Sequence, residues 1–259
     1  MATSLAQMRA ELGAAMARSG PGLSTANELC TACVALLGVD GAAISMILDG
    51  ASSGTFGSSG EASRRLDEYQ FTFGEGPCLE AAATAEVVHA PDLDAAHEQR
   101  WPMFADAVLG DGIRAVFALP VMLTSACVGA LDLYRTRPGP LRGDQLAGGL
   151  LAAELAGLPV LTMMSHVVED SVADKTENTA DAANEDAWAH LIEMDRIEVY
   201  QATGMLIAQL NVSAAEALVR LRAHALASGQ TASEVAYAIL GEGLQLERDH
   251  HDGQEGRRP

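Results

Sequence analysis

Apolar positions in the last quarter of the chain recur at helical spacing and are separated by clear breaks. The first apolar stripe consists of Leu191, Met194, Ile197, Tyr200, Met205 and Ala208. The pattern stops at Asn211, and Ser213 then precedes Glu216 at the spacing of a capping box. Ser228-Gly229-Gln230 ends a second helical pattern, and a third begins at Thr231 with the same capping spacing. We therefore expect three short helices, a unit that buries too little surface to be a catalytic domain.

The longer N-terminal region mixes helical and strand patterns. Helical spacing predicts helices over residues 5–18, 24–37, 62–69, 101–109 and from 143 onward. Strand patterns occupy residues 41–48, 86–89, 114–123 and 127–134, and the Gly- and Ser-rich residues 52–60 indicate a turn or a weak second strand. The two last strands are joined by Thr124-Ser125-Ala126, which predicts an antiparallel hairpin. Strands with segregated helices indicate an α+β domain.

These patterns divide the chain into five parts. We expect a lead-in helix over residues 1–23, an α+β domain over 24–164, an acidic linker over 165–185, a helical domain over 186–247 and a disordered tail over 248–259. The acidic segment Glu169 to Asp186 is also compatible with the start of a long helix, since it is rich in alanine.

The charge balance limits the possible partners. The 259 residues carry a net charge of −19, and Lys175 is the only lysine. From Trp188 to Glu247 three basic and seven acidic residues give 3 − 7 = −4. Non-specific nucleic-acid binding depends on phosphate neutralisation, so any RNA contact must be local and shape-based. The most apolar stretch, Leu146 to Met164, is interrupted by Glu154 and Pro159, and we expect a cytoplasmic protein without a membrane span.

The chain lacks the patterns of common catalytic and metal sites. No phosphate-binding loop, dinucleotide fingerprint, nucleophile elbow or zinc-protease motif is present, so we expect neither an enzyme nor a metal site. The residues do not identify a cofactor. Cys30 and Cys33 are spaced to share one helical face and favour a place in a core, with a redox or metal role as the alternative.

Several C-terminal residues resemble a known family. Ala202-Thr203-Gly204-Met205-Leu206, followed by Glu216-Ala217 and Leu221-Arg222, is similar to the ANTAR domain, roughly from Asp186 to Glu247. The resemblance implies a three-helix bacterial module that binds RNA hairpins and prevents transcription termination. This chain has Thr203 where the family commonly has a lysine. The candidate RNA-binding residues are Arg196, Gln201, Thr203, Gly204, Arg220, Arg222 and His224.

The N-terminal region resembles a second family. Gly74-Glu75-Gly76-Pro77-Cys78, Trp101-Pro102 and the hairpin around Ala118-Leu119-Pro120-Val121 are similar to the GAF sensor fold, over about Ser24 to Met164. This implies an antiparallel sheet with flanking helices, which in this family either holds a small molecule of one of several kinds or serves as a dimerisation scaffold. The candidate pocket residues are Glu75, Gly76, Cys78, Trp101 and Phe104. The Gly-Glu-Gly-Pro run either presents free N–H groups to an anion or serves as a structural turn, and the two aromatic rings either line the pocket or pack in the core.

Together the two resemblances predict a signal-responsive regulator. A GAF sensor would control a homodimeric ANTAR module that binds hairpins in nascent transcripts and acts by transcription antitermination. The alternative is a sensing or protein-interaction scaffold whose ANTAR-like module no longer binds RNA, which the acidic charge and Thr203 favour. The orientation of Arg196, Arg220 and Arg222 separates the two, because one shared exposed face would support RNA binding.

Overall fold

The computed structural model describes residues 4–19, 22–48, 51–174 and 196–246. The side chains of 51–53 and 163–174 are outside that description. The chain divides into two compact units, Met1–Arg196 and Ile197–Pro259, which we call the first and the second unit. The expected residues 175–185 of the linker and the tail 248–259 lie outside the described residues, as do Leu191 and Met194 of the apolar stripe.

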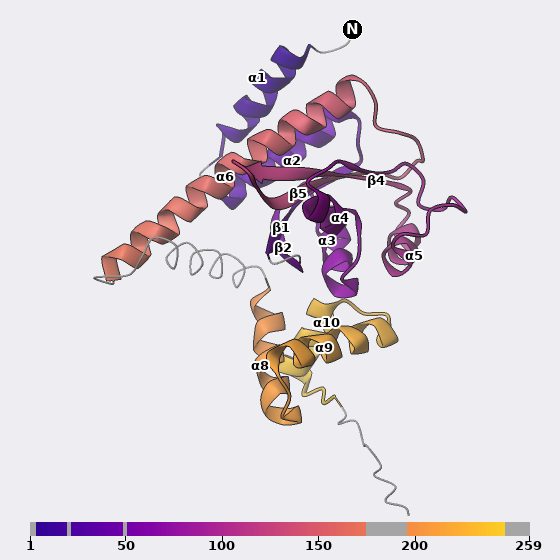
Figure 1. Cartoon of the computed structure of the whole chain (residues 1–259), viewed down its shortest axis with the longest axis vertical. Helices are drawn as coiled ribbons and strands as arrows, with labels where there is room; N and C mark the ends of the chain where they lie inside the picture. Colours follow the sequence, from indigo (N-terminus) through magenta and orange to yellow (C-terminus); the bar gives the residue numbers. More distant parts are fainter. Residues whose placement is uncertain (1–3, 20–21, 49–50, 175–195, 247–259) are drawn as a thin grey trace, which may run out of the picture. The chain divides into compact units, whose positions relative to one another are not determined.

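A five-stranded antiparallel sheet forms the centre of the first unit (Figure 1). Its strands are β1 (Gly41–Leu48), β2 (Ala51–Ser58), β3 (Val88–Ala90), β4 (Ala115–Leu123) and β5 (Ala126–Arg135), in the order β2-β1-β5-β4-β3. The predicted β4–β5 hairpin is confirmed. The weak second strand is a full strand of eight residues, although its pairing with β1 has two register shifts.

Three helices lie on one side of this sheet, two of them against its strands and the N-terminal one against those two helices (Figure 1). They are α1 (Leu5–Met16), α2 (Leu23–Leu37) and α6 (Asp144–Asp174), and their apolar side chains share one core with β1, β4 and β5. The helix α6 continues into the segment that we expected to be a linker. Its part Asp144–Thr162 is long and apolar enough to cross a membrane, as is the bent pair Ile197–Leu210 and Ala214–Ser228 taken together. Half of the Asp144–Thr162 window is buried, as in a helix that packs on a sheet.

The opposite face of the sheet carries α3 (Glu61–Phe73), α4 (Pro77–Thr84) and α5 (Pro102–Gly110) (Figure 1). A second core of apolar side chains fills this side, including Leu66, Trp101, Phe104 and Val116. Polar residues from β1, β2, β5 and α3 are buried on the same side. This mixture distinguishes the α3 side of the sheet from the wholly apolar α6 side.

Over residues 197–246, the second unit consists of the three expected helices and one π-helical turn. They are α8 (Ile197–Leu210), α9 (Ala214–Ser228), α10 (Ala232–Tyr237) and η1 (Ala238–Glu242). The break after α8 lies at Asn211, whose φ is +56°, and α8 and α9 meet there at 107°. The left-handed conformation is one that asparagine tolerates better than most residues.

The face of α8 that packs in the second unit differs from the predicted stripe. The buried residues of α8 include Val199, Ala202, Leu206 and Leu210. The stripe residues Ile197, Tyr200 and Met205 are exposed instead, by 53%, 38% and 48%. Two apolar faces therefore exist on one helix, and the pattern alone could not tell which one the second unit buries.

Both predicted capping residues accept the expected backbone hydrogen bond, but only one capping box is complete. At α10, the Thr231 hydroxyl accepts from the Glu234 N–H and the Glu234 carboxylate accepts from the Thr231 N–H, at 3.2 and 2.8 Å. At α9, Ser213 accepts from the Glu216 N–H at 3.2 Å. The Glu216 carboxylate turns instead to the Arg220 guanidinium, at 2.8 Å.

Thr231→Ala should therefore weaken the second unit more than Ser213→Ala. We expect a loss of about 1–2 kcal/mol for Thr231→Ala, because it removes a cap in a partly buried box, and about 0.5–1 kcal/mol for Ser213→Ala. Native-state hydrogen exchange at the amides of α9 and α10 in the full chain measures both losses. Equal losses in the two variants would contradict the reciprocal bond at Thr231.

Candidate functional site

A cluster of buried polar side chains lies between the sheet and α3 in the first unit. Asp67 on α3 is fully buried, and its Oδ2 accepts a hydrogen bond from the Thr55 hydroxyl at 2.6 Å. Its Oδ1 accepts one from the Ser45 hydroxyl. Hydroxyl groups from β1 and β2 thus fix both oxygens of one carboxylate. A buried carboxylate that is held in this way is an acceptor prepared for a cation.

Arg196 supplies that cation. Its side chain is only 2% exposed, and its Nη2 lies 2.9 Å from Asp67 Oδ2. Its Nη1 lies 3.5 Å from a Glu68 carboxylate oxygen, and the guanidinium carbon is 3.9 Å from the centroid of the Phe71 ring. The Nε and Nη1 atoms are buried without a hydrogen-bond partner. The guanidinium is therefore held by charge and by an aromatic face, with part of its hydrogen-bonding capacity unused.

Gln70 joins the same cluster to the start of α4. Its Nε2 donates to Asp132 Oδ2 at 2.6 Å, and its Oε1 accepts from the backbone N–H of Cys78 at 2.8 Å. Asp132 on β5 is fully buried, and its Oδ1 has no hydrogen-bond partner. Burial raises the pKa of Asp132 well above its usual range, and the nearby Asp67 charge raises this pKa further.

Both helix starts around the predicted anion-binding loop are capped by the protein itself. The N–H of Cys78, near the start of α4, is used by Gln70. At α5, the Glu75 carboxylate accepts from the N–H groups of Met103 and Phe104, at 2.7 and 3.0 Å. Gly76 precedes α4 with a φ of +147°, and a Cβ there would lie 2.5 Å from Gln70 Oε1. These contacts favour the structural-turn interpretation of the Gly-Glu-Gly-Pro run.

The aromatic and sulfur candidates of the pocket also take part in packing. Trp101 and Phe104 are buried and meet edge to face, with ring centroids 6.4 Å apart. The Arg100 guanidinium carbon lies over the Trp101 ring, 4.1 Å from its centroid. Cys78 is fully buried, and burial raises the pKa of its thiol well above the usual range. A neutral, buried thiol is a poor nucleophile.

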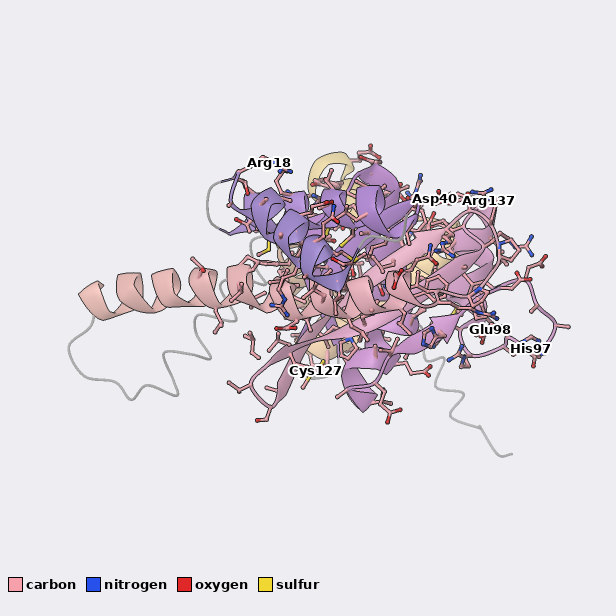
Figure 2. The ribbon with its side chains drawn as sticks, turned by 90° about the horizontal axis from the view of Figure 1, so that it is seen from above. Arg18, Asp40, His97, Glu98, Cys127 and Arg137 are labelled. Carbon is pink, nitrogen blue, oxygen red and sulfur yellow. The ribbon has the colours of Figure 1, made fainter. Side chains whose placement is uncertain are left out.

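Cys30 and Cys33 lie in the core on the α6 side, as the helical spacing predicted. Burial raises the pKa of Cys33 to about 12 and that of Cys30 well above its usual range. Cys127, in contrast, is only partly buried and lies at the start of β5, in the lower part of Figure 2.

Over the described residues, no group of His, Cys, Asp and Glu side chains could hold a metal ion.

The remaining RNA-binding candidates belong to the second unit and do not form one charged face. Gln201 and Gly204 are exposed on α8, while Thr203 is 7% exposed and its hydroxyl donates to the Val199 carbonyl at 2.7 Å. On α9, Arg220 and His224 are four residues apart and share a face, but Arg222 points to another side of the helix. Arg220 is also paired with Glu216.

The structure thus separates the three arginines that were expected to act together. Arg196 is buried beside Asp67 in the first unit. Arg220 and Arg222 lie on different sides of α9 in the second unit. By the criterion set from the sequence, this distribution weakens the case for a single cationic RNA-binding face.

Comparison with known families agrees with this two-part architecture. Residues 23–158 match the family model of the GAF domain, which is more than half of the chain. The chain belongs to the GAF domain family. Residues 194–240 match the family model of the ANTAR domain, so the helices of the second unit are those of an ANTAR domain. No curated protein matches the chain.

A solved GAF domain shares the fold of the first unit. The GAF domain of a phosphoenolpyruvate-protein phosphotransferase from Coxiella burnetii is 15% identical, with a TM-score of 0.50, over 64% of this chain and 97% of that one. The corresponding domain from Acinetobacter is also 15% identical, with a TM-score of 0.49, over 66% of this chain and 99% of that one. At this identity the likeness concerns the fold alone.

Sequence reasoning missed the centre of the GAF polar cluster. Asp67, Gln70 and Asp132 were not among the candidates, yet each is fully buried on the α3 side of the sheet. The run Ala130-Leu131-Asp132-Leu133 contained a signal, because an aspartate inside an apolar strand is rarely buried without a specific reason. The burial of Asp67 was harder to predict, since acidic residues are common on the exposed face of a helix.

Asp132→Asn is expected to stabilise the GAF domain at neutral pH and to change its pH dependence. The folded-state pKa of Asp132 lies above the unfolded value, so the unfolded chain releases this proton first as the pH rises. From about pH 4 up to the folded-state pKa, the wild-type free energy of unfolding should therefore fall by about 1.4 kcal/mol per pH unit relative to Asp132→Asn. Urea unfolding at several pH values measures the difference.

Asp40→Asn is the matched control for this experiment. A hydrogen bond from the Thr136 N–H lowers the pKa of Asp40, so its contribution to stability is present above its unfolded pKa and is lost as the pH falls. The wild type should gain stability relative to Asp40→Asn as the pH rises, which is the opposite sign. A pH-independent difference between Asp132→Asn and the wild type would contradict the raised pKa.

Proposed function

We propose that this protein is a cytoplasmic, signal-responsive regulator that binds RNA hairpins through its ANTAR domain and acts by transcription antitermination. The observation that carries the proposal is the presence of a GAF domain and an ANTAR domain in one chain. Both are regulatory rather than catalytic families. The GAF domain receives a signal, and the ANTAR domain provides the output. The proposed boundaries remain residues 24–164 and 186–247.

The exposed surface of the ANTAR helices supports RNA recognition by shape more than by charge. Gln201 and Gly204 lie on the exposed side of α8, where glycine allows a backbone to come close to a base or phosphate. Arg220 and His224 provide donors on one side of α9, and Arg222 provides one on another. We propose these five residues as RNA contacts. Arg196 is buried in the described arrangement and becomes a contact only after it leaves Asp67.

The exposed apolar side of α8 supports a homodimer. Ile197, Tyr200 and Met205 are large apolar residues that α8 presents to solvent. They continue the helical stripe whose first members are Leu191 and Met194 in the sequence. An apolar stripe of this length is typical of a helix that pairs with a second copy. Gln201 and Gly204 lie on the same side of α8 as this stripe, so a dimer paired through it would contact RNA through Arg220, Arg222 and His224 of α9, one set on each copy.

The scaffold without RNA affinity is the second candidate, and specific contacts favour it. Arg220 is paired with Glu216, and the Thr203 hydroxyl is used by the helix backbone. Thr203→Lys distinguishes the two candidates, since it restores the lysine of the family resemblance. If RNA affinity appears only in this variant, the natural chain is the scaffold without RNA affinity.

The RNA proposal predicts a specific salt dependence. We expect the full chain to bind a two-hairpin RNA obtained by selection in vitro, and Arg220→Ala with Arg222→Ala to weaken binding about tenfold or more at modest salt. Each lost phosphate contact should reduce the slope of log affinity against log salt by about 0.7–1. Fluorescence anisotropy over a salt series measures both quantities.

Arg137→Ala provides a control for the loss of a positive charge outside the ANTAR domain, because Arg137 is exposed after β5 of the GAF domain and lies beside Asp40 (Figure 2). It should leave the affinity and the slope nearly unchanged. If no two-hairpin RNA binds the wild type at modest salt, with or without small-molecule ligands, the proposed RNA-binding function is wrong. If Arg137→Ala weakens RNA binding as much as the ANTAR variant does, the loss of affinity is due to net charge and not to specific contacts.

A further inference from the structure

We propose that Asp67, Glu68 and Phe71 form a guanidinium-binding site in the first unit, which Arg196 fills as a tethered ligand and a free guanidinium compound fills in competition. The inference deepens the small-molecule part of the proposed function and rests on it. The proposed ligand is a planar guanidinium cation, and it displaces the side chain of Arg196. RNA binding is not needed for it.

The acceptor side of this site is built by residues other than Arg196. The Ser45 and Thr55 hydroxyls, from β1 and β2, each donate to one oxygen of Asp67. Asp67 is fully buried, so its carboxylate has exchanged water for these two donors and one cation. Removal of the cation would leave a buried negative charge with two hydroxyl donors only. A replacement cation is therefore strongly favoured at this place.

The shape of the site selects a planar cation. The Phe71 ring lies 3.9 Å from the guanidinium carbon and so offers its negative face to one flat side of the cation. The two carboxylates, Asp67 and Glu68, meet two different nitrogen atoms of the guanidinium, at 2.9 and 3.5 Å. An ammonium group has no flat face and concentrates its charge at one point. It can therefore satisfy the two carboxylates and the ring together less well than a guanidinium.

Arg196 fills the site incompletely. Its Nε and Nη1 are buried and lack hydrogen-bond partners, and Asp132 Oδ1 in the same polar cluster lacks one as well. Each buried polar group without a partner weakens the arrangement. A free guanidinium compound is not constrained by the chain that leads to Arg196, so it can turn its N–H groups toward acceptors that the Arg196 side chain leaves unused. The site is thus suited to exchange between a tethered and a free occupant.

The two occupants exclude each other. Arg196 is followed directly by Ile197, the first residue of α8. When a free ligand takes the site, residue 196 is no longer fixed to the first unit. A tethered group competes as a ligand at an effective concentration of about 1 mM. The wild type should therefore bind a free guanidinium compound at least about tenfold more weakly than a variant that lacks the Arg196 side chain.

The test uses N-propylguanidinium, which reproduces the end of the arginine side chain, and isothermal titration of the full chain without RNA. We expect Arg196→Ala to bind one equivalent, at least about tenfold more tightly than the wild type. n-Butylammonium, with the same charge and a similar apolar length, should bind Arg196→Ala at least about tenfold more weakly. The double variant Arg196→Ala/Asp67→Asn should lose the binding.

The proposal is overturned if Arg196→Ala binds N-propylguanidinium no better than the wild type does, or no better than it binds n-butylammonium. If Arg196→Ala does not fold, the same titration is made with Arg196→Lys. This variant keeps a cation beside Asp67 but replaces the guanidinium by an ammonium group. N-Propylguanidinium should then bind Arg196→Lys more tightly than the wild type, and equal affinities would overturn the proposal. Because the titration contains no RNA, its failure leaves RNA binding untouched, and a failure of RNA binding leaves the titration unaffected.

Discussion

Replacement of Arg196 by methionine is expected to destabilise the GAF domain by about 3–5 kcal/mol. Methionine fills much of the same space and can still contact Phe71, but it leaves the fully buried Asp67 carboxylate without its cation. Breaking a buried pair costs more than the pair itself contributes, because the remaining charge is uncompensated. Denaturant unfolding of the full chain, followed by the fluorescence of the buried Trp101, measures the loss.

The double variant Arg196→Met/Asp67→Asn is the control for this result. It removes the fully buried carboxylate together with its cation and should recover at least half of the loss, since Glu68, which remains, is partly exposed to solvent. Arg9→Met removes an arginine from an exposed pair with Glu154 and should cost less than about 1 kcal/mol. A loss below about 1 kcal/mol for Arg196→Met would show that Asp67 does not depend on this cation.

Gly76→Ala should destabilise the GAF domain by about 2–4 kcal/mol. The residue has a φ of +147°, which alanine adopts only with strain, and the new Cβ would lie 2.5 Å from Gln70 Oε1. Gln70 cannot move freely, because it bridges Asp132 and the Cys78 N–H. The added methyl group should therefore disturb the polar cluster as well as the turn. Thermal and denaturant unfolding of the full chain measure the loss.

Gly74→Ala separates the backbone strain from the contact. Gly74 has a φ of +66° and nothing within 4 Å of its would-be Cβ. Alanine there should cost only about 1 kcal/mol, from the left-handed conformation alone. Similar losses at Gly74 and Gly76 would mean that the contact with Gln70 contributes nothing.

The sequence predicted most elements of the fold because their patterns are local. The β4–β5 hairpin and the helix boundaries follow from alternation, turn residues and caps within a few positions. The buried face of α8 was not predictable in this way. Its residues Val199 and Leu206 pack in the ANTAR domain, while Tyr200 and Met205 face solvent, although both sets are apolar. Only the packing of α9 and α10 decides between them.

The candidate site was less predictable than the fold, because its chemistry is assembled from distant positions. Asp67 meets Thr55, Ser45 and Arg196, and the last of these is 129 residues away in sequence. The resemblance to the ANTAR domain makes Arg196 an RNA-binding candidate, and nothing near it in the sequence indicates that its side chain is buried. The Gly-Glu-Gly-Pro run was recognised, but only the bonds of Glu75 and Gln70 show that its helix starts are already capped.

The order of the strands limits how two copies of this protein can associate. The sheet ends at β2 on one side and at β3 on the other. The first edge is interrupted by two register shifts against its neighbour, and the second is only three residues long. Neither edge offers a long, regular row of free amide and carbonyl groups, which is what strand addition and fibril growth need. Both edges of the GAF sheet are therefore poor templates for the addition of a strand from another chain.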